Sequence, residues 1–300
     1  MTAETVAVVV VTYNRKEFLR ECLEALLAQS RPPDEIIVVN NNSMDGTAEM
    51  LALEFPQVTV LTISENIGGA GGFAHGMQLA RDKGHNWILI MDDDAILHPE
   101  ALIRLLEHAC GEQKAIMGCL ARSRDTEELV WPLKVEGEWK LSVSQVPNRP
   151  FVTESLPFLG LLISSRAISE IGLPNSDFFV CCDDVEYSYR ASKAGYAIVC
   201  IPTSILYHPV PRRRLLRFGK YILCLEFMPP WKGYYDARNR ILLGLKFEGS
   251  RFWCKHLPVL LLRIALSLVC WGARAKRLRF YMIGILDGFM QRTGKRVIPQ

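Results

Sequence analysis

The sequence lacks several features that would assign it to a special class of protein. Its nine cysteines include no CxxC pair and no Cys/His spacing of a zinc site, so we expect reduced thiols rather than a disulfide framework. No basic stretch followed by an apolar run stands at the N-terminus, so we expect no secretory signal. The longest apolar run, 257–271, is interrupted by Arg263 and is shorter than the ~20 residues of a membrane-spanning helix. These absences favour a cytoplasmic globular protein.

Acidic residues are scarce at one end of the chain. Asp287 is the single acid in 251–300, against ten Lys and Arg, so this segment carries a net charge of +9. The first 250 residues hold 25 basic and 31 acidic residues, a net charge of −6. The overall charge of +3 is too small to indicate nucleic-acid binding, and we expect none. The asymmetry predicts an acidic body and a basic tail that meets an anionic surface.

The order of apolar segments predicts an α/β fold. The runs 6–11, 35–39 and 58–63 are apolar, rich in β-branched residues and of strand length, and helical spacing of apolar residues separates them over 18–29 and 47–55. Strand, helix, strand, helix, strand at this spacing is typical of a doubly wound, mostly parallel sheet flanked by helices. Ligands bind such sheets beyond the carboxyl ends of the strands.

Three adjacent carboxylates follow a further strand-length apolar run. The run 87–91 ends at Asp92, Asp93 and Asp94, and Asp92 and Asp94 share a face if the segment is extended. Like charges at this spacing repel unless a cation neutralises them, and oxygen ligands suit Mg²⁺ or Mn²⁺. A solvated acidic turn or a helix N-terminus is the alternative. Because polar clusters also follow the first two strands, we expect one shared site at this edge of the sheet.

A glycine-rich segment, 68–76, follows the third strand. Its Gly69-x-Gly71-x-x-Ala74 spacing matches a dinucleotide fingerprint, but that fingerprint belongs after the first strand of its unit. We expect a loop whose backbone approaches a phosphate or sugar at the start of the helix that ends near Lys83. A tight turn with positive φ is the alternative.

A second acidic cluster stands at the predicted start of a helix. Asp183 and Glu186 fit an N-cap and its capping-box partner, which leaves Asp184 without a structural explanation. His208 directly follows the last predicted strand. A histidine there is usually an ordinary surface or core residue, but it also suits a nitrogen ligand of the same metal.

Together these motifs resemble glycosyltransferase family 2, the inverting enzymes of the GT-A fold. The resemblance covers residues 5 to about 210, and the motifs stand in the family's order. A narrower pattern resembles the galactofuranosyl- and rhamnosyltransferases that build bacterial surface polysaccharides. It consists of Glu65-Asn66-x-Gly68-Gly69-Ala70-Gly71-Gly72-Phe73, Met91-Asp92-Asp93-Asp94 and Tyr234-Tyr235-x-x-Arg238-Asn239.

The resemblance implies a GT-A catalytic domain over 1–210 and a helical, basic region over 211–300. It implies a general base, Asp184, with acceptor-binding Asp183 and Glu186, and Arg190 paired with these acids. It implies Mn²⁺ or Mg²⁺ held by Asp92, Asp94 and His208. The donor-binding residues it implies are Thr12, Tyr13, Asn14, Arg15, Asn41, Asp45, Gly69, Gly71, Asp92 and Asp93.

The function this implies is metal-dependent, inverting transfer of galactofuranose from UDP-galactofuranose onto a lipid-linked glycan acceptor. A rhamnosyltransferase using dTDP-rhamnose is the first alternative. A sugar nucleotidyltransferase would share the sheet and the metal but needs no base at Asp184. A protein that binds the donor without turnover would not need the full set of acids.

The C-terminal region is predicted to have a separate role. Apolar residues of 257–268 share one helical face beside Arg263, as in a basic amphipathic helix lying on an anionic bilayer. This predicts a peripheral protein on the inner face of the cell membrane. The alternative is an ordinary helix that packs on the domain or in a homo-oligomer.

Overall fold

The computed structural model describes residues 4–109, 114–218 and 221–298, and it divides into two compact units. The sheet unit comprises Met1–Asn175 and Tyr187–Val210, and the helical unit comprises Ser176–Glu186 and Pro211–Gln300. Residues 176–186, which we placed in the catalytic domain, therefore group with the C-terminal part of the chain. The three acids of the second predicted cluster lie in this segment.

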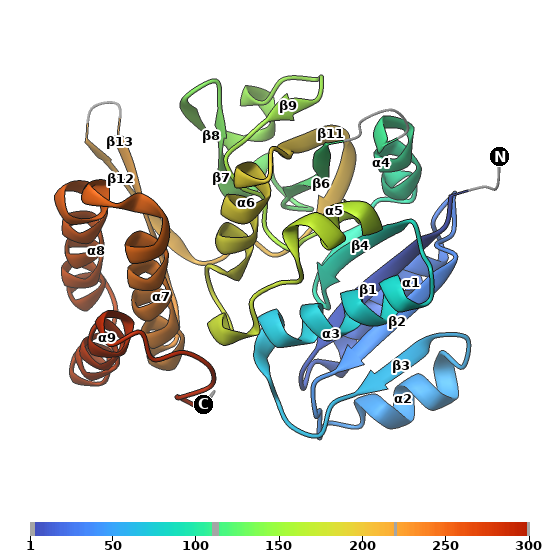
Figure 1. The fold of residues 1–300 in the computed structure, drawn as a ribbon, viewed down its shortest axis with the longest axis horizontal. Coiled ribbons are helices and arrows are strands. Elements are labelled where there is room, and N and C mark those ends of the chain that lie inside the picture. The colour runs from blue at the N-terminus through green and yellow to red at the C-terminus, as the bar shows by residue number, and fades with distance from the viewer. Residues whose placement is uncertain (1–3, 110–113, 219–220, 299–300) are drawn as a thin grey trace. The chain divides into compact units, whose positions relative to one another are not determined.

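A mostly parallel sheet forms the centre of the sheet unit (Figure 1). Its strands run in the order β3-β2-β1-β4-β10-β6-β11-β5, and β10 is antiparallel to both of its neighbours. Strands β7 and β8 form an antiparallel pair beside β6. The strands are β1 (Val6–Thr12), β2 (Glu35–Asn40), β3 (Thr59–Thr62), β4 (Trp87–Asp92), β5 (Ile96–Leu97), β6 (Ala115–Arg122), β7 (Glu128–Val135), β8 (Glu138–Ser142), β9 (Phe151–Val152), β10 (Leu161–Ser164) and β11 (Ala197–Tyr207).

Helices cover both faces of this sheet. Alternate residues of β1 point to opposite sides, so Val8 belongs to a core that includes residues of α1, α2 and α4, whereas Val9 belongs to a core that includes residues of α3 and α5. The predicted α/β architecture is confirmed. The helices are α1 (Lys16–Leu27), α2 (Thr47–Glu54), α3 (Gly68–Asp82), α4 (Ala101–Ala109), α5 (Ser165–Ile171) and α6 (Asp183–Lys193), of which α6 has its first four residues in the helical unit.

The register of the parallel strands aligns their carboxyl ends. Thr12 of β1 stands opposite Asn40 of β2, and Val11 stands opposite Asp92 of β4. The polar residues that follow these strands therefore meet at one edge of the sheet, as the sequence predicted.

The glycine-rich segment is helix rather than loop, so the expectation of a loop is wrong. Its glycines form the first turns of α3, which lies close against β1. A Cβ atom on Gly72 would stand 2.6 Å from Cγ1 of Val11, and one on Gly76 would stand 2.3 Å from Cγ1 of Val9. The repeated glycines thus allow close packing of helix on strand, a tertiary requirement that a periodicity argument does not reveal.

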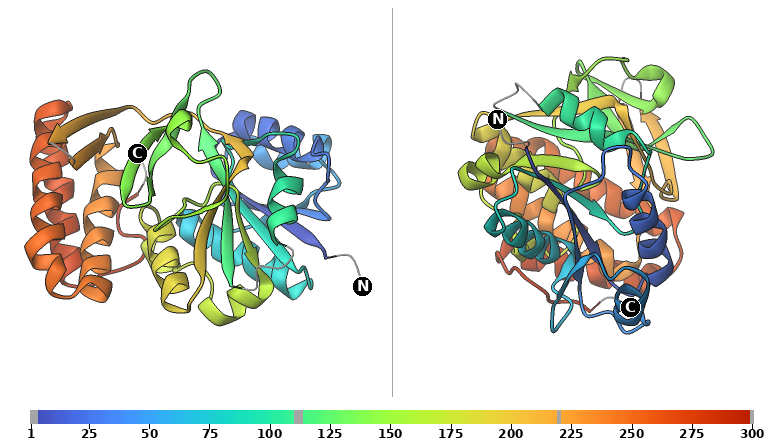
Figure 2. Two further views of the ribbon diagram at one scale, coloured as in Figure 1. Left: turned by 90° about the horizontal axis from the view of Figure 1, so that it is seen from above. Right: turned by 90° about the vertical axis from the view of Figure 1, so that its right-hand side faces the viewer.

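The helical unit contains a hairpin and three long helices that lie side by side (Figure 2). The hairpin, β12 (Arg213–Phe218) and β13 (Tyr221–Glu226), was not predicted, because its basic residues masked the strand pattern. The helices are α7 (Pro230–Leu243), α8 (Leu257–Cys270) and α9 (Arg274–Phe289). Gly284 of α9 allows a close approach to α7, since a Cβ there would lie 2.4 Å from the carbonyl oxygen of Tyr234.

A π-helical turn, Phe252–His256, extends α8 at its N-terminus. The continuous helical run Phe252–Cys270 has 19 residues, and within the described residues it is the one helix whose length and composition would let it cross a membrane. This helical run begins five residues before the apolar run 257–271 that the sequence analysis considered. Length and composition alone do not distinguish such a helix from a core helix of a soluble protein.

Candidate active site

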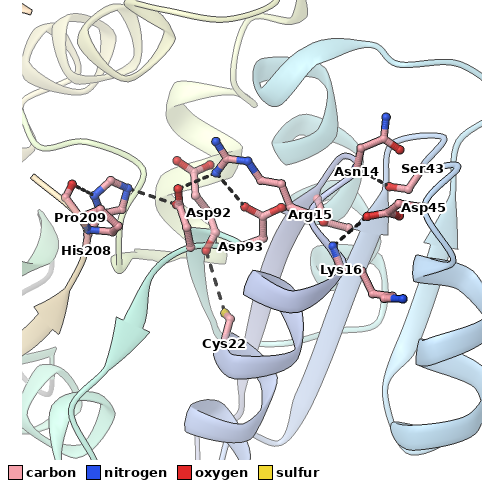
Figure 3. A network of polar contacts seen from close by, with 12 residues as sticks. Asn14, Arg15, Lys16, Cys22, Ser43, Asp45, Asp92, Asp93, His208 and Pro209 are labelled. Atoms are coloured by element: carbon pink, nitrogen blue, oxygen red, sulfur yellow. Dashed lines mark hydrogen bonds and ion pairs between the residues drawn. The ribbon is translucent and has the colours of Figure 1, made fainter. Parts of the chain in front are cut away.

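The loops after β1 and β2 are joined by hydrogen bonds (Figure 3). Asn14, with a φ of 53°, donates its backbone N–H to Ser43 Oγ at 3.0 Å, and its side-chain oxygen accepts from Met44 N at 2.7 Å. The carboxylate of Asp45 accepts from Lys16 N at 2.9 Å. Two predicted donor-binding residues, Asn14 and Asp45, thus hold these loops together.

Asn41 joins the end of β2 to the start of α3. This buried side chain donates to the carbonyl oxygen of Gly68 at 3.0 Å and accepts from Ile67 N at 2.9 Å. Its first role in the structure is therefore to fix the N-terminal turn of α3, which carries the predicted donor-binding residues Gly69 and Gly71.

Asp93 anchors the acidic triplet to the sheet. It is buried and accepts a hydrogen bond from Thr12 Oγ1 at 2.7 Å and one from Arg15 Nη1 at 3.4 Å. Burial raises the pKa of Asp93 to about 6, against the opposing effect of Arg15. Tyr13, also predicted to bind the donor, is exposed beside these residues.

Asp94 lies between two cationic side chains. Arg15 donates to one of its oxygens, and Nε2 of His208 is 3.1 Å from the other. Burial alone would raise the pKa of Asp94, but His208 and Arg15 outweigh it and lower this pKa to about 2. Burial would likewise lower the pKa of His208, and Asp94 overcomes that effect and raises it. The predicted convergence of His208 on the acidic triplet is confirmed (Figure 3).

The hydrogen bond of the other ring nitrogen of His208, Nδ1, limits the protonation states of the Nε2 atom that faces Asp94. Nδ1 is 2.7 Å from the carbonyl oxygen of Pro209, which only accepts, so Nδ1 carries a proton. Nε2 then presents to the carboxylate either a second proton or a lone pair, and a lone pair there needs a cation beside it.

This pair fits a divalent cation. Neighbouring ligands of an octahedral ion with bonds of about 2.1 Å stand about 3 Å apart, which matches the 3.1 Å between Nε2 of His208 and Oδ1 of Asp94. Within the described residues no three His, Cys, Asp or Glu side chains form a group that could hold a metal. An ion here would therefore need further oxygens, such as those of a diphosphate, as Mg²⁺ sites commonly do.

Asp184 lies in the first turn of α6, within the helical unit. It is half-buried, and its Oδ1 accepts from the backbone N–H of Val185 at 2.8 Å. Burial raises the pKa of Asp184, while this hydrogen bond and the positive charges of Arg240 and Lys232 oppose the rise. A carboxylate with a raised pKa is a better proton acceptor than an ordinary aspartate.

The neighbours of Asp184 are held inside the helical unit. Glu186 is fully buried and accepts from Lys246 Nζ at 3.0 Å. The carbonyl oxygen of Cys182 accepts from Glu186 N at 2.9 Å, so Cys182 rather than Asp183 occupies the N-cap position. The N-cap of α6 thus lies one residue before the position that we predicted.

Arg190, which we expected to pair with these acids, also contacts main-chain oxygens. Its guanidinium donates to the carbonyl oxygens of Ile171 at 2.6 Å and Leu173 at 2.8 Å, within the sheet unit. Lys232 and Arg240 of α7, which sequence reasoning missed, are cations that act on Asp184. The sequence feature that could have pointed to Arg240 is its i,i+4 spacing from Asp236, and the two side chains pair across one helical turn at 2.8 Å.

The chain matches the family described as "Glycosyl transferase family 2" over residues 7–161. It is 30% identical over 253 residues to the galactofuranosyltransferase GlfT1 of Mycobacterium tuberculosis strain H37Rv, with 79% of this chain and 81% of the relative covered. It is 23% identical over 300 residues to the dTDP-rhamnosyl transferase RfbF of Shigella flexneri, with 95% of this chain and 96% of the relative covered.

Solved structures share the fold. The structure of GalNAc-T7 with UDP, GalNAc and Mn²⁺ superposes with a TM-score of 0.64 at 13% identity, covering 97% of this chain and 57% of that one. The mannosyltransferase PcManGT of Pyrobaculum calidifontis, in complex with GDP-Man and Mn²⁺, gives 0.56 at 17% identity, covering 97% of this chain and 89% of that one. These neighbours identify the fold as GT-A.

Proposed function

This chain belongs to glycosyltransferase family 2 and is a glycosyltransferase, and we propose that it transfers galactofuranose from UDP-galactofuranose to a lipid-linked glycan. The observation that carries the donor choice is the identity to GlfT1, 30% over four-fifths of both chains. The same transfer from dTDP-rhamnose is the second candidate, favoured by the end-to-end match to RfbF at 23%. Family membership removes the nucleotidyltransferase alternative.

The donor is proposed to lie at the carboxyl ends of β1, β2 and β4. A divalent ion held by Asp94 and His208, with Asp92 beside them, would stabilise the charge that develops on the leaving diphosphate. Arg15 already bonds to this triplet, and its guanidinium can donate two parallel hydrogen bonds to oxygens of a diphosphate. Thr12 and Asp93 hold Arg15 and the triplet in register, so the site is organised before the donor binds.

Asp184 is proposed as the general base. It takes the proton of an acceptor hydroxyl while that oxygen attacks the anomeric carbon, and the bond from this carbon to the diphosphate oxygen breaks with its electron pair. Attack opposite the leaving group inverts the anomeric configuration. The raised pKa of Asp184 supports this role, and Asp183 is proposed to orient acceptor hydroxyls. Glu186, which we expected to share that role, is fully buried and bonded to Lys246.

The acceptor is proposed to be anionic and lipid-linked. One of the relatives is named N-acetylglucosaminyl-diphospho-decaprenol L-rhamnosyltransferase, and the helical unit offers positive charge near Asp184 through Lys232 and Arg240. The burial of Arg263 on α8 lowers its pKa, and the positive charge of Arg240 lowers it further. A guanidinium in this position favours an anion beside it.

Helix α9 supports a location on the membrane surface. Four large apolar side chains are exposed along it at spacings of three and four residues, which places them on one helical stripe: Leu278, Met282, Leu286 and Phe289. Arg274, Lys276 and Arg279 are exposed at its N-terminal end. Each such cation contributes about 1 kcal/mol near an anionic leaflet.

A panel of nucleotide sugars tests the donor. Purified enzyme, Mn²⁺ and a synthetic polyprenyl-diphosphate saccharide are incubated with each donor, and nucleotide release and glycosylated product are both measured. We expect transfer from UDP-galactofuranose, lost with EDTA and restored by Mn²⁺. Turnover with dTDP-rhamnose alone would replace the first candidate with the second, and turnover with neither would reject both.

Vesicle sedimentation tests the membrane location. We expect the chain to pellet with phosphatidylglycerol vesicles at low salt, to pellet less at high salt, and not to pellet with phosphatidylcholine alone. Replacing Leu278 and Met282 by serine should abolish pelleting, whereas replacing the exposed Met44 and Leu53 of the sheet unit should not. Equal pelleting of both variants would contradict the α9 proposal.

A further inference from the structure

The motif Tyr234-Tyr235-x-x-Arg238-Asn239 lies inside the helical unit and is completely buried. All four side chains of this motif are 0% exposed. One helical turn separates the two tyrosines from Arg238 and Asn239, so the four share one region of α7. The transfer mechanism gives these residues no role.

Arg238 donates to main-chain oxygens. Its Nη2 bonds to the carbonyl oxygens of Asp177 at 3.0 Å and Phe178 at 2.9 Å, and its Nη1 bonds to that of Gly294 at 2.6 Å. Its Nε donates to the side-chain oxygen of Asn239 at 2.8 Å. A guanidinium satisfies several carbonyl oxygens at fixed angles, which a lysine cannot do.

Asn239 completes the set of contacts. Its amide nitrogen lies 3.0 Å from the carbonyl oxygen of Phe178, 2.9 Å from that of Val180 and 2.7 Å from that of Cys181. Its amide oxygen faces Arg238, so the amide nitrogen is directed at the loop. Arg238 and Asn239 together bond to four carbonyl oxygens of 177–181.

The loop that they hold has an unfavourable backbone conformation. Phe179, Cys181 and Cys182 have φ values of 64°, 68° and 61°, in the left-handed region that non-glycine residues rarely adopt. Such a conformation persists only where the surroundings over-determine it, and such sites cluster where function requires a fixed geometry. The next residues are Asp183 and Asp184, the first of α6.

Aromatic rings and the segment after α9 hold the same loop from other sides. The ring of Phe179 stacks on that of Tyr235 at 4.8 Å, and the guanidinium of Arg238 lies over Tyr235 at 4.9 Å. The hydroxyl of Tyr235 donates to the carbonyl oxygen of Val297 at 2.7 Å, and Gly294 N donates to the carbonyl oxygen of Asp177 at 2.8 Å. Contacts from α7 and from the segment after α9 thus hold the loop within the helical unit.

We propose that Arg238 and Asn239 are positioning residues for the transfer reaction, because they fix the left-handed loop that sets where α6 begins and where Asp184 points. The inference rests on the proposed role of Asp184 as general base. It assigns the motif to the chemistry of the acceptor hydroxyl, in addition to the stability of the helical unit. A loop released from these bonds would place Asp184 in several orientations, and a misplacement of about 1 Å in a catalytic group lowers turnover about 100-fold.

The test compares Asn239→Ala with Leu260→Ala. Leu260 is a buried residue of α8 in the same unit, has no part in the loop contacts, and serves as the control for lost stability. We measure the melting temperature, kcat, donor KM, and hydrogen exchange of the peptide 176–186 by mass spectrometry. We expect both variants to melt lower, and only Asn239→Ala to exchange faster in 176–186 and to lose about 100-fold in kcat with donor KM unchanged.

Combination with Asp184→Asn separates positioning from other effects. If Asn239 acts through Asp184, Asn239→Ala lowers the residual single-turnover rate of Asp184→Asn no further. The proposal is overturned if Asn239→Ala loses no more kcat than Leu260→Ala, if 176–186 exchanges equally in both, or if the loss is undiminished in the Asp184→Asn background. Normal turnover of Asp184→Asn itself would instead contradict the proposed function.

Discussion

The two acidic clusters of this chain are neutralised in different ways. In the sheet unit, Arg15 and His208 contact Asp94 directly, and the pKa of Asp94 falls to about 2 despite its burial. In the helical unit, Asp184 has one main-chain hydrogen bond and the more distant charges of Lys232 and Arg240, and its pKa is raised. The first arrangement keeps a carboxylate charged at every working pH, which suits a cation. The second favours uptake of a proton, which suits a base.

The supports of the two clusters differ as well. The side chains of Thr12 at the end of β1 and Arg15 in the following loop bond to the triplet in the sheet unit. In the helical unit, Arg238 and Asn239 fix main-chain carbonyl oxygens ahead of Asp184. The sites for a metal and for a base thus obtain their rigidity from different sources, and each can be broken separately.

Removal of the base should have the largest effect. Asp184→Asn is expected to lower kcat by about 10³-fold, within the range for general base catalysis, while the Kd of UDP measured by calorimetry stays unchanged. Asp183→Asn, at the neighbouring position, should mainly raise acceptor KM. Equal losses of kcat in the two variants would remove the distinction between base and acceptor-binding residue.

Removal of the nitrogen ligand should have the next largest effect. His208→Ala is expected to weaken Mn²⁺ binding in the presence of UDP by about 10- to 100-fold, the range for a damaged metal site. Electron paramagnetic resonance of free Mn²⁺ measures this without turnover. His108→Ala, on α4, is the control and should bind normally. Unchanged affinity in His208→Ala would show that the metal lies elsewhere.

Substitutions in α3 separate packing from donor contact. Gly76→Ala brings a methyl group against Val9 and is expected to lower the free energy of unfolding by about 1–3 kcal/mol. At Gly69 the nearest atom to an added Cβ is 4.0 Å away, so Gly69→Ala should keep full stability. Denaturant unfolding measures both. If Gly69→Ala folds normally yet binds UDP more weakly, the predicted donor contact of the α3 N-terminus is supported.

The smallest effect is expected in the pH profile. The positive charge of Arg240 favours the carboxylate form of Asp184 and so lowers its pKa. Arg240→Gln should therefore raise this pKa and move the acidic limb of kcat to higher pH. Activity at a given acidic pH falls, because more of the base is protonated. Arg279→Gln, exposed on α9, should leave the limb in place, and a shift toward lower pH in Arg240→Gln would reverse the assigned sign.

Local pattern was sufficient to predict the sheet and the acidic triplet. Val6–Thr12 and Trp87–Asp92 are buried apolar runs whose polar ends must meet in a parallel sheet, and the register confirms this. The position of His208 directly after a strand allowed either an ordinary histidine or a partner of the triplet, and the structure places it 3.1 Å from Asp94. These predictions succeeded because they depend on strand order and burial.

Other features depend on tertiary contacts that no window of sequence contains. The glycines of 68–76 serve helix packing against Val9 and Val11 rather than a loop. Arg190 bonds to carbonyl oxygens at and after the end of α5. Arg240, which the sequence analysis did not single out, acts on Asp184. In each case the residue type was informative, and its partner was determined by packing.

The most direct measurement is a crystal structure of the enzyme with UDP and Mn²⁺. The account predicts that the ion is coordinated by Asp94, by Nε2 of His208 and by both phosphates of UDP, with Arg15 turned from the triplet toward the diphosphate. An ion bound by the diphosphate but away from His208, or a diphosphate bound away from the ends of β1 and β4, would contradict it.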